Sequence, residues 1–416
     1  MAGAQGPLEE SLLWHERPIP DDRPAAPAGA PHVVLLLVDA LRRDQLSPWG
    51  GPPEVTPNFT RSAAGGAVFG DVIAQSVWNK PALVAVTTGQ EATRIGVVET
   101  GDGPDRQPVP EDQTTLAEAF SAKGWHTIGL TANFNQNEAM GFAQGFDRYR
   151  DSQMSSFQRE TRTTAEASVE RALRLVGERP VDRPVFLQMV WSDLHKPFVV
   201  PGDVAARFDG PDHDIAPYRA VLNQMDDVFG QLLDGLHSRG VATDQTLVLV
   251  VATHGEGLSM PDSHGRQHGR LMAPSVAVVA AWMHGPGVGP GVRVDGLVAQ
   301  VDFYPTLLTM AGLTAAGSGP GVDLAPLVRT GGRTTRTTAF TDTWFLEAER
   351  SAAWTSTRAC VRNDGPAPAD GFVPGCFDRM GDPDHLSPIE DAALSSELEA
   401  WRAGQLLGLQ AARSGG

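Results

Sequence analysis

The sequence predicts an α/β fold, a three-layer sandwich around a mostly parallel central sheet, with a small C-terminal antiparallel subdomain. Almost continuously apolar segments at 32–39, 125–131, 184–191 and 246–253 are typical of strands buried on both faces, as in parallel sheets. Residues 218–240 repeat apolar side chains at three- and four-residue spacing and end at a glycine, which is typical of an amphipathic helix. Alternation of such strands and helices defines the class.

The character of the sequence changes after about residue 335. Short segments at 338–342 and 351–356 predict a small antiparallel sheet, and residues 390–407 predict a closing helix. The first thirty residues are rich in proline, alanine and acids, which favours a loosely held arm. The predicted division is therefore a flexible arm over 1–30, an α/β domain over 31–334 and a small α+β subdomain over 335–416.

Charge and composition exclude several classes of partner. The net charge of -17 is spread along the chain, which argues against nucleic acid or an anionic membrane but allows a small anionic ligand. Cys360 and Cys376 could pair, but two cysteines do not make a disulfide framework. The N-terminus does not resemble a signal peptide, and no apolar run reaches the roughly 18 residues of a membrane span. We therefore expect a soluble cytoplasmic protein, and the sequence leaves the oligomeric state open.

Polar side chains follow three of the predicted strands and open one predicted helix. Asp39 ends the first strand, the residues SDLH at 192–195 follow the third, and THGE at 253–256 follows the fourth. Asn79 stands at the start of a helix. Because the carboxyl ends of parallel strands meet at one edge of a sheet, these groups are expected to converge. Carboxylate and imidazole in one pocket are typical of a metal site.

The order of these motifs strongly resembles the sulfatase family of the alkaline phosphatase superfamily, over about residues 32–385. The resemblance implies an alkaline phosphatase-like sandwich and metal-assisted cleavage of a sulfate or phosphate ester. It rests on DALRRD at 39–44, TPN at 56–58, GFD at 145–147, HGE at 254–256, VDFYPT at 301–306 and CFD at 376–378.

The position that carries the attacking side chain in the resembled family is occupied here by Asn79, two residues before Pro81. The family uses a formylglycine made from cysteine or serine, or a plain serine or threonine. An amide cannot form a covalent sulfo- or phospho-enzyme, and no cysteine lies in this motif, so formylglycine is excluded there. Asparagine is a favoured N-cap, so we predict a capping role for Asn79, with metal or substrate contact as the alternative.

The resemblance implies a divalent metal ion held by Asp39, Thr253 and His254. Thr253 replaces the aspartate that the family places before its His-Gly-Glu loop. A single carboxylate is a poor ligand set for Ca²⁺ or Mg²⁺. With His264 and His268 nearby in the sequence, Mn²⁺ or Zn²⁺ is an alternative.

Side chains in the matching motifs are also predicted to contact an anionic substrate. For each of them the competing interpretation is an ordinary structural or solvated residue. The predicted catalytic residues are Asn79, Lys80, His195, Lys196 and His268, and the predicted substrate ligands are Arg266 and His264.

Three hypotheses about function remain open at this point. The first is a sulfatase-type enzyme with a rebuilt centre, in which water or a hydroxyl of Ser76, Thr87 or Thr88 attacks. The second is a homologue that has lost activity and binds an anionic ligand or a protein. The third is an enzyme that performs group transfer or elimination in the same pocket, with Lys80 or Lys196 as the base. The retained histidines and lysines favour an enzyme.

Overall fold

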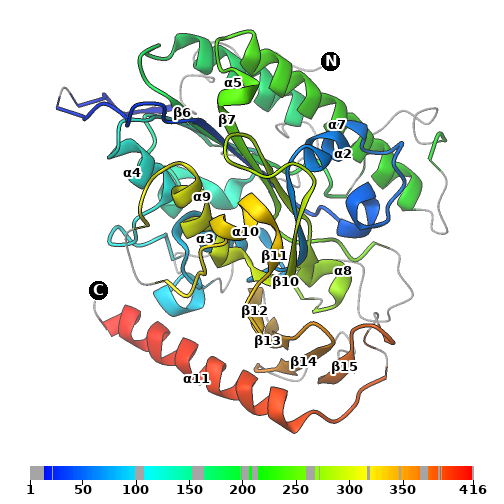
Figure 1. Ribbon diagram of the computed structural model, residues 1–416. Helices are drawn as coiled ribbons and strands as arrows, with labels where there is room; N and C mark the ends of the chain where they lie inside the picture. Colours follow the sequence, from blue (N-terminus) through cyan, green and yellow to red (C-terminus); the bar gives the residue numbers. More distant parts are fainter. Residues whose placement is uncertain are drawn as a thin grey trace, which may run out of the picture.

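The α/β class predicted from the sequence is confirmed. A large, mostly parallel sheet is covered by helices on both faces, and a smaller antiparallel sheet lies beside it (Figure 1). The computed structural model describes residues 14–20, 22–98, 107–151, 164–196, 198, 206–208, 214–258, 268–270, 272–315, 319–345, 348–365, 373–382, 385 and 387–414.

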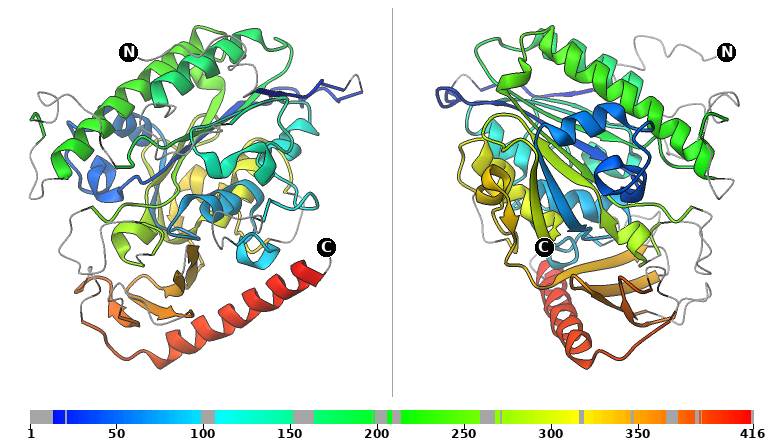
Figure 2. Two further views of the ribbon diagram at one scale, coloured as in Figure 1. Left: turned by 180° about the vertical axis from the view of Figure 1, so that it is seen from behind. Right: turned by 45° about the vertical axis from the view of Figure 1, so that its right-hand side comes forward.

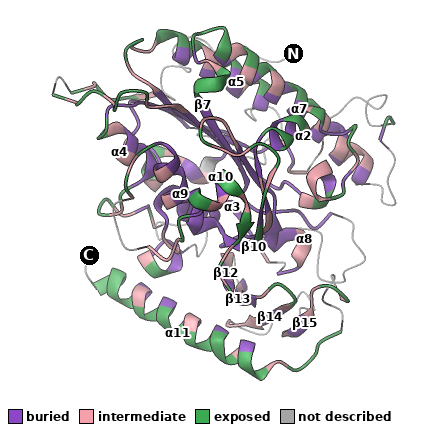
Figure 3. Cartoon of the chain, in the orientation of Figure 1, coloured by how far each residue is buried: buried purple, intermediate pink, exposed green. Residues whose placement is uncertain are grey.

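The four predicted strands form the centre of the large sheet. β4 (His126–Thr131), β6 (Val185–Trp191), β2 (His32–Val38) and β7 (Thr246–Ala252) are parallel neighbours in that order. Almost every side chain in them is buried, as Figure 3 shows in purple. Because both faces of these strands are covered, their sequences are continuously apolar and do not alternate. Their carboxyl ends therefore lie at one edge of the sheet.

Additional strands extend the sheet on both sides, with antiparallel pairing at β1, β8 and β9. Beyond β4 lie β5 (Arg148–Arg150) and β1 (Trp14–Glu16). Beyond β7 lie β9 (Ala281–His284), β3 (Ala67–Ile73), β10 (Val292–Ala299) and β11 (Gly332–Arg333), while β8 (Val278–Val279) pairs with β3.

Two helical layers enclose the sheet (Figures 1 and 2). One layer contains α2 (Pro57–Ala64), α5 (Ala165–Glu178) and α7 (Ile215–His237). The other contains α3 (Asn79–Thr88), α4 (Leu116–Ser121), α9 (Phe303–Met310) and α10 (Ala325–Thr330), and the short α8 (Pro274–Ala277) lies just before β8. Within the described residues, no helix combines the length and the apolarity that a membrane crossing demands.

The described part of the arm predicted over 1–30 makes specific contacts with the large sheet. β1 pairs with β5 at the edge of the large sheet. The guanidinium of Arg23 donates two hydrogen bonds, of 2.7 and 2.6 Å, to the carboxylate of Asp147. A few specific contacts of this kind hold a segment whose composition alone suggests disorder. Residues 1–13 lie outside the described residues.

The small sheet follows the large one in the chain, and its strands are antiparallel. The last strand of the large sheet ends at Arg333, and the first strand of the small sheet begins at Ala339. The elements of this region are β12 (Ala339–Phe345), β13 (Ala348–Trp354), β14 (Arg358–Asn363), β15 (Gly375–Asp378) and the long α11 (Ala392–Ser414), which begins and ends later than predicted.

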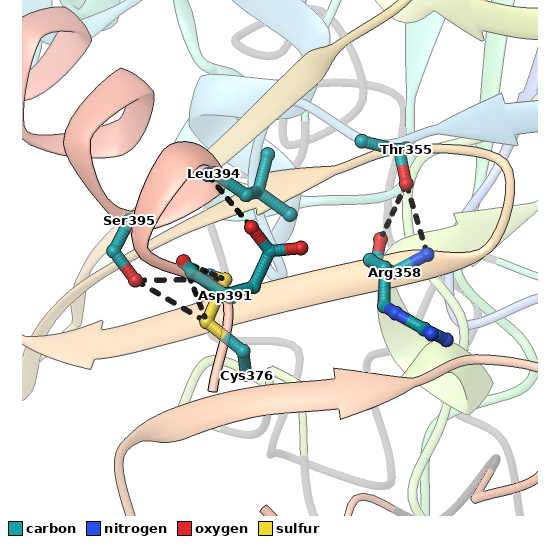
Figure 4. The surroundings of a disulfide bond; sticks show 7 residues. Thr355, Arg358, Cys376, Asp391, Leu394 and Ser395 are labelled. Atoms are coloured by element: carbon teal, nitrogen blue, oxygen red, sulfur yellow. Dashed lines mark hydrogen bonds between the residues drawn. A yellow bond between two sulfur atoms is a disulfide. The ribbon is translucent and has the colours of Figure 1, made fainter. Parts of the chain in front are cut away.

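A disulfide joins Cys360 to Cys376, which are directly opposite each other on β14 and β15. Figure 4 shows it beside the start of α11, where the hydroxyl of Ser395 lies 3.3 Å from Cys376 Sγ. The pairing that the sequence allowed is therefore present. Structural disulfides are more usual in exported proteins than in cytosolic ones, so this bond does not favour the cytoplasmic location, which stays a prediction.

The C-terminal helix α11 connects the small sheet to the large domain. The indole N–H of Trp401 and the side-chain amide of Gln405 both donate to the carboxylate of Glu91, at 2.9 and 2.6 Å. The next residue, Arg402, pairs with Glu349 on β13 and lies over the ring of Trp344 at 4.7 Å. These contacts bind α11 to the segment after α3 and to the small sheet.

Replacing Glu91 with alanine is expected to loosen α11. The substitution leaves Trp401 and Gln405 without their charged acceptor, so we expect a loss of about 2 kcal/mol in the free energy of unfolding. Chemical denaturation measures this loss, and hydrogen exchange over 392–414 is expected to accelerate. The control Glu397→Ala removes an exposed carboxylate from the same helix and is expected to change stability by less than about 0.5 kcal/mol. Unchanged exchange in α11 of Glu91→Ala would contradict this account of its docking.

Candidate functional site

Asp39 follows β2 directly, is fully buried, and forms the centre on which other strand ends converge. Its Oδ1 accepts a hydrogen bond from the hydroxyl of Thr253 at 2.9 Å and lies 2.7 Å from Nε2 of His254. Its Oδ2 accepts from the side-chain amide of Asn79 at 3.0 Å. The structure thus brings together four predicted residues, from the ends of β2 and β7 and the start of α3.

Groups that follow β4 and β6 complete the surroundings of Asp39. Its Oδ2 also accepts from the amide of Asn133 at 3.2 Å and from the hydroxyl of Ser192 at 3.3 Å. Nε2 of His195, another predicted residue, lies 3.7 Å from the same oxygen. We did not predict Asn133 from the sequence. A signal was present, because it closely follows the carboxyl end of a buried strand, as Asp39 and Thr253 do.

The turn that carries Asp39 is strained, and a side chain of α7 stabilises it. Ala40 has a φ of 57°, in the left-handed region that costs a non-glycine residue roughly 1–2 kcal/mol. The hydroxyl of Tyr218 donates to the carbonyl of Ala40 at 2.8 Å and accepts from the backbone N–H of Arg42 at 2.8 Å. Tyr218 therefore fixes the backbone on which the carboxylate of Asp39 depends.

The capping role predicted for Asn79 is wrong, as the structure at the start of α3 shows. The N-cap position is Trp78, and no side chain of the described residues caps the helix. Asn79 is the first residue of the helix itself, and its side-chain amide N–H donates to the carboxylate of Asp39. Its buried Oδ1 has no hydrogen-bond partner among the described residues. An uncapped helix start offers its N–H groups and its dipole to an anion.

His268 joins His195 and His254 in a cluster of three imidazoles. Its ring stacks on His254 with centroids 4.4 Å apart, and its centroid lies 4.8 Å from that of His195. Nδ1 of His268 lies 3.0 Å from the carboxylate of Glu256, a partner that we did not predict. A Cβ at Gly255 would stand 2.0 Å from the carbonyl oxygen of Ser275, so only glycine fits between His254 and Glu256.

Burial and charge act against each other at this site. Burial on its own raises the pKa of Asp39, but the imidazoles of His195 and His254 outweigh it and hold that pKa well below its usual value. Burial lowers the pKa of His195 to about 4, so its ring is neutral at pH 7. Burial also acts to lower the pKa of His268, but the carboxylate of Glu256 raises it above the usual value. In return, His268 lowers the pKa of Glu256 against the effect of burial.

The remaining predicted residues have other surroundings. Lys196 pairs with Asp214, the residue before α7. Lys80 is almost fully buried, and its Nζ lies 3.9 Å from the sulfur of Met140. The predicted substrate ligands Arg266 and His264 lie outside the described residues, so their roles stay predictions.

The hydroxyls considered as substitutes for the missing nucleophile do not face Asp39. The side chains of Ser76, Thr87 and Thr88 donate to backbone carbonyl oxygens, at 2.6, 2.8 and 2.7 Å. For Thr87 and Thr88 the acceptor lies one turn earlier in α3, which is the usual bond of a helical threonine. The hydroxyls that do contact the carboxylate belong to Ser192 and Thr253.

The fold and the site together define an α/β protein with a carboxylate–imidazole cluster at the carboxyl ends of parallel strands, as in metallohydrolases. The Sulfatase family model matches residues 31–313, and the chain belongs to the sulfatase family, within the alkaline phosphatase superfamily. The resemblance found in the sequence motifs is thereby confirmed.

Characterised relatives are distant and in part longer than this chain. Arylsulfatase A of Bos taurus is 26% identical over 371 residues, which cover 76% of this chain and 71% of that protein. N-acetylgalactosamine-6-sulfatase of Homo sapiens is 23% identical over 334 residues, and the match covers 68% of this chain and 62% of that enzyme. The match to human arylsulfatase K, at 28% identity, covers 41% of this chain and 32% of that protein.

Solved structures share the fold over almost the whole chain. The phosphonate monoester hydrolase of Agrobacterium radiobacter aligns with a TM-score of 0.72 at 19% identity, over 92% of this chain and 95% of that one. A protein solved in complex with its substrate D-glucosamine-2-N,6-O-disulfate aligns with a TM-score of 0.70 at 16% identity, over 90% of this chain and 98% of that one. At these identities the likeness concerns the fold.

Members of the sulfatase family generally use a divalent metal ion, and the donors around Asp39 decide which kind fits. Ca²⁺ takes about 6–8 oxygen ligands, and Mg²⁺ also prefers oxygen. Two carboxylates belong to the described strand ends that meet here: both oxygens of Asp39 already accept hydrogen bonds, and Glu256 contacts His268. Thr253 contributes a hydroxyl where the family's motif has an aspartate. The oxygen donors therefore do not fit a hard ion of the Ca²⁺ type.

Proposed function

We propose that this chain hydrolyses a sulfuric or phosphoric ester, and that water attacks the sulfur or phosphorus atom in place of a protein side chain. Family membership supports the class of ester. The position of Asn79 is the observation that supports attack by water. Asn79 occupies the start of α3, and its side-chain amide donates a hydrogen bond to Asp39. An amide has no hydroxyl or thiolate to form a covalent intermediate.

The side chains present can hold the anionic group of such an ester. The first turn of α3 offers N–H groups that no described side chain caps. Beside it, imidazoles and amides surround the carboxylate of Asp39. Donors that are already oriented towards the developing negative charge lower the barrier to hydrolysis. A divalent ion, when bound, would neutralise further charge on the transferred group.

Group transfer or elimination with a lysine base receives less support. Lys196 is paired with Asp214, and Lys80 lies against Met140. A homologue that only binds its ligand would keep the same pocket, so turnover separates it from an enzyme.

Purified protein, supplied in turn with Zn²⁺, Mn²⁺ and Ca²⁺, is expected to hydrolyse at least one of nitrophenyl sulfate, nitrophenyl phosphate and a nitrophenyl phosphonate ester. His254→Ala is expected to lower kcat/KM by more than about 100-fold, since a transition-state contact of about 2.7 kcal/mol corresponds to that factor. The release of nitrophenol measures the rate directly.

Ser76→Ala and Thr88→Ala serve as controls, because Ser76 lies before α3, Thr88 ends it, and both hydroxyls donate to backbone carbonyls. Both are expected to keep the rate of the unmodified chain. Abolition of turnover by either control would identify a hydroxyl nucleophile and refute attack by water. A folded, metal-supplied protein that turns over none of the three esters would refute the enzymatic function.

A further inference from the structure

The imidazoles of His195, His254 and His268 are arranged as ligands of one ion. They follow different elements of the fold, since His195 follows β6, His254 follows β7 and His268 lies further along the loop. Their candidate ligand atoms all lie within 4.8 Å of one another. Ligand atoms around a tetrahedral Zn²⁺ with bonds of 2.0–2.1 Å are about 3.3 Å apart. Small side-chain movements would therefore close the cluster around an ion.

Each of these rings has one nitrogen held by an oxygen outside the cluster. Nδ1 of His195 lies 3.2 Å from the carbonyl oxygen of Ser192, and Nδ1 of His254 lies 2.7 Å from that of Gly255. Nδ1 of His268 lies 3.0 Å from the carboxylate of Glu256. An acceptor at Nδ1 favours the tautomer with the proton on that nitrogen. The lone pair then stands on Nε2, as metal-binding histidines require.

His254 and Asp39 supply an independent observation. Nε2 of His254 lies 2.7 Å from Oδ1 of Asp39, and it makes no hydrogen bond of acceptable geometry among the described residues. With the proton on Nδ1, two lone pairs face each other across this distance. They repel unless a positive charge lies with them, either a second proton on the ring or a metal ion bound to both atoms.

We propose that His195, His254 and His268, together with Asp39, bind a divalent ion that prefers nitrogen ligands, of the Zn²⁺ class. Three imidazoles and one carboxylate are a common tetrahedral set for such an ion, whereas Ca²⁺ and Mg²⁺ select oxygen. The site would replace the oxygen-rich centre that Thr253 and Asn79 no longer provide. The binding is independent of turnover, and only the role of the ion as a Lewis acid rests on the proposed function.

Metal titration of the full chain, stripped beforehand with a chelator, tests the site. Zn²⁺ is expected to bind with one ion per chain, as measured by calorimetry and by elemental analysis after desalting. Co²⁺ is expected to give the intense visible absorption of tetrahedral coordination, and Ca²⁺ is expected to bind more weakly than Zn²⁺. These readouts do not depend on activity.

Variants connect the binding to the three imidazoles. His195→Ala and His268→Ala are each expected to weaken Zn²⁺ binding by more than about 100-fold. Glu256→Gln leaves all ligands in place but weakens the acceptor behind His268, and it is expected to cost about 10–100-fold. His237→Ala, which removes an exposed histidine at the end of α7, is the matched control and is expected to bind like the unmodified chain. Circular dichroism checks that each variant is folded.

The outcomes distinguish this site from the proposed function. If none of the site variants changed the Zn²⁺ affinity, the site would be overturned. A folded chain that binds neither Zn²⁺ nor Co²⁺ would overturn it as well. In that case a second proton on His254 accounts for its contact with Asp39. Ester turnover that persists without metal in a chelator would overturn the role of the ion as a Lewis acid and would leave the hydrolytic function standing. Tight, imidazole-dependent binding without turnover would support the site and refute the hydrolytic function.

Discussion

Replacing Asp39 with alanine is expected to abolish ester hydrolysis and to lower the free energy of unfolding by about 3–5 kcal/mol. The carboxylate is the shared acceptor of groups that follow β4, β6 and β7 and of the start of α3. Without it, several buried donors lose their partner at once, and each such donor costs about 1–3 kcal/mol. Chemical denaturation and the assay on nitrophenyl esters measure the two effects.

Asp39→Asn separates the effect of losing the charge from the effect of losing the side-chain volume, and a second variant serves as a control. Asp39→Asn keeps the shape and one acceptor oxygen, so we expect a smaller loss of stability than for alanine but the same loss of turnover. Asp295→Ala removes an exposed carboxylate that pairs with the exposed Arg293 and is expected to change stability by less than about 1 kcal/mol. If Asp39→Ala were as stable as the unmodified chain and as active, Asp39 would not be the centre of the pocket.

Introducing Asn79→Thr and Thr253→Asp together is expected to raise ester turnover by about 100-fold, which is about 2.7 kcal/mol of barrier. The first substitution supplies a hydroxyl at the helix start, and the second supplies the carboxylate that a hard ion needs. The hydroxyl of Thr253 lies 2.9 Å from Oδ1 of Asp39, so the double variant places two carboxylates in contact. They repel each other until a cation lies between them.

The double variant is therefore expected to become dependent on Ca²⁺. An ion supplied at about 100 times its Kd would raise the free energy of unfolding by about 2.7 kcal/mol, which calorimetry detects as a higher Tm. Thr253→Asp alone is expected to show the Ca²⁺ dependence without a covalent intermediate, and Asn79→Thr alone is expected to show neither. A folded double variant with no gain in turnover would mean that parts of the site beyond these two positions have diverged.

Much of the fold could be predicted from the sequence for a simple physical reason. A strand covered on both faces must be apolar throughout, so the stretches at 32–39 and 246–253 are conspicuous, and a polar residue that ends such a stretch stands at the edge of the sheet. The convergence of Asp39, His195 and His254 follows from that geometry. Motif spacing then supported the family.

Other parts of the site depend on contacts that periodicity does not encode. The pairing of His268 with Glu256 and the hydrogen bond from Asn79 to Asp39 join side chains that no periodic pattern in the sequence places together. Composition likewise does not encode the pairing of β1 at the sheet edge or the two bonds from Arg23 to Asp147.

Attack by water at a pocket without a protein nucleophile is tested most directly by the stereochemical course of hydrolysis. A phosphorothioate ester, made chiral at phosphorus by one heavy oxygen isotope, is hydrolysed by the protein in water that carries another oxygen isotope, and the configuration of the thiophosphate product is measured. A single displacement by water predicts inversion at the transferred atom. Retention would require two displacements through a covalent intermediate and would contradict the account.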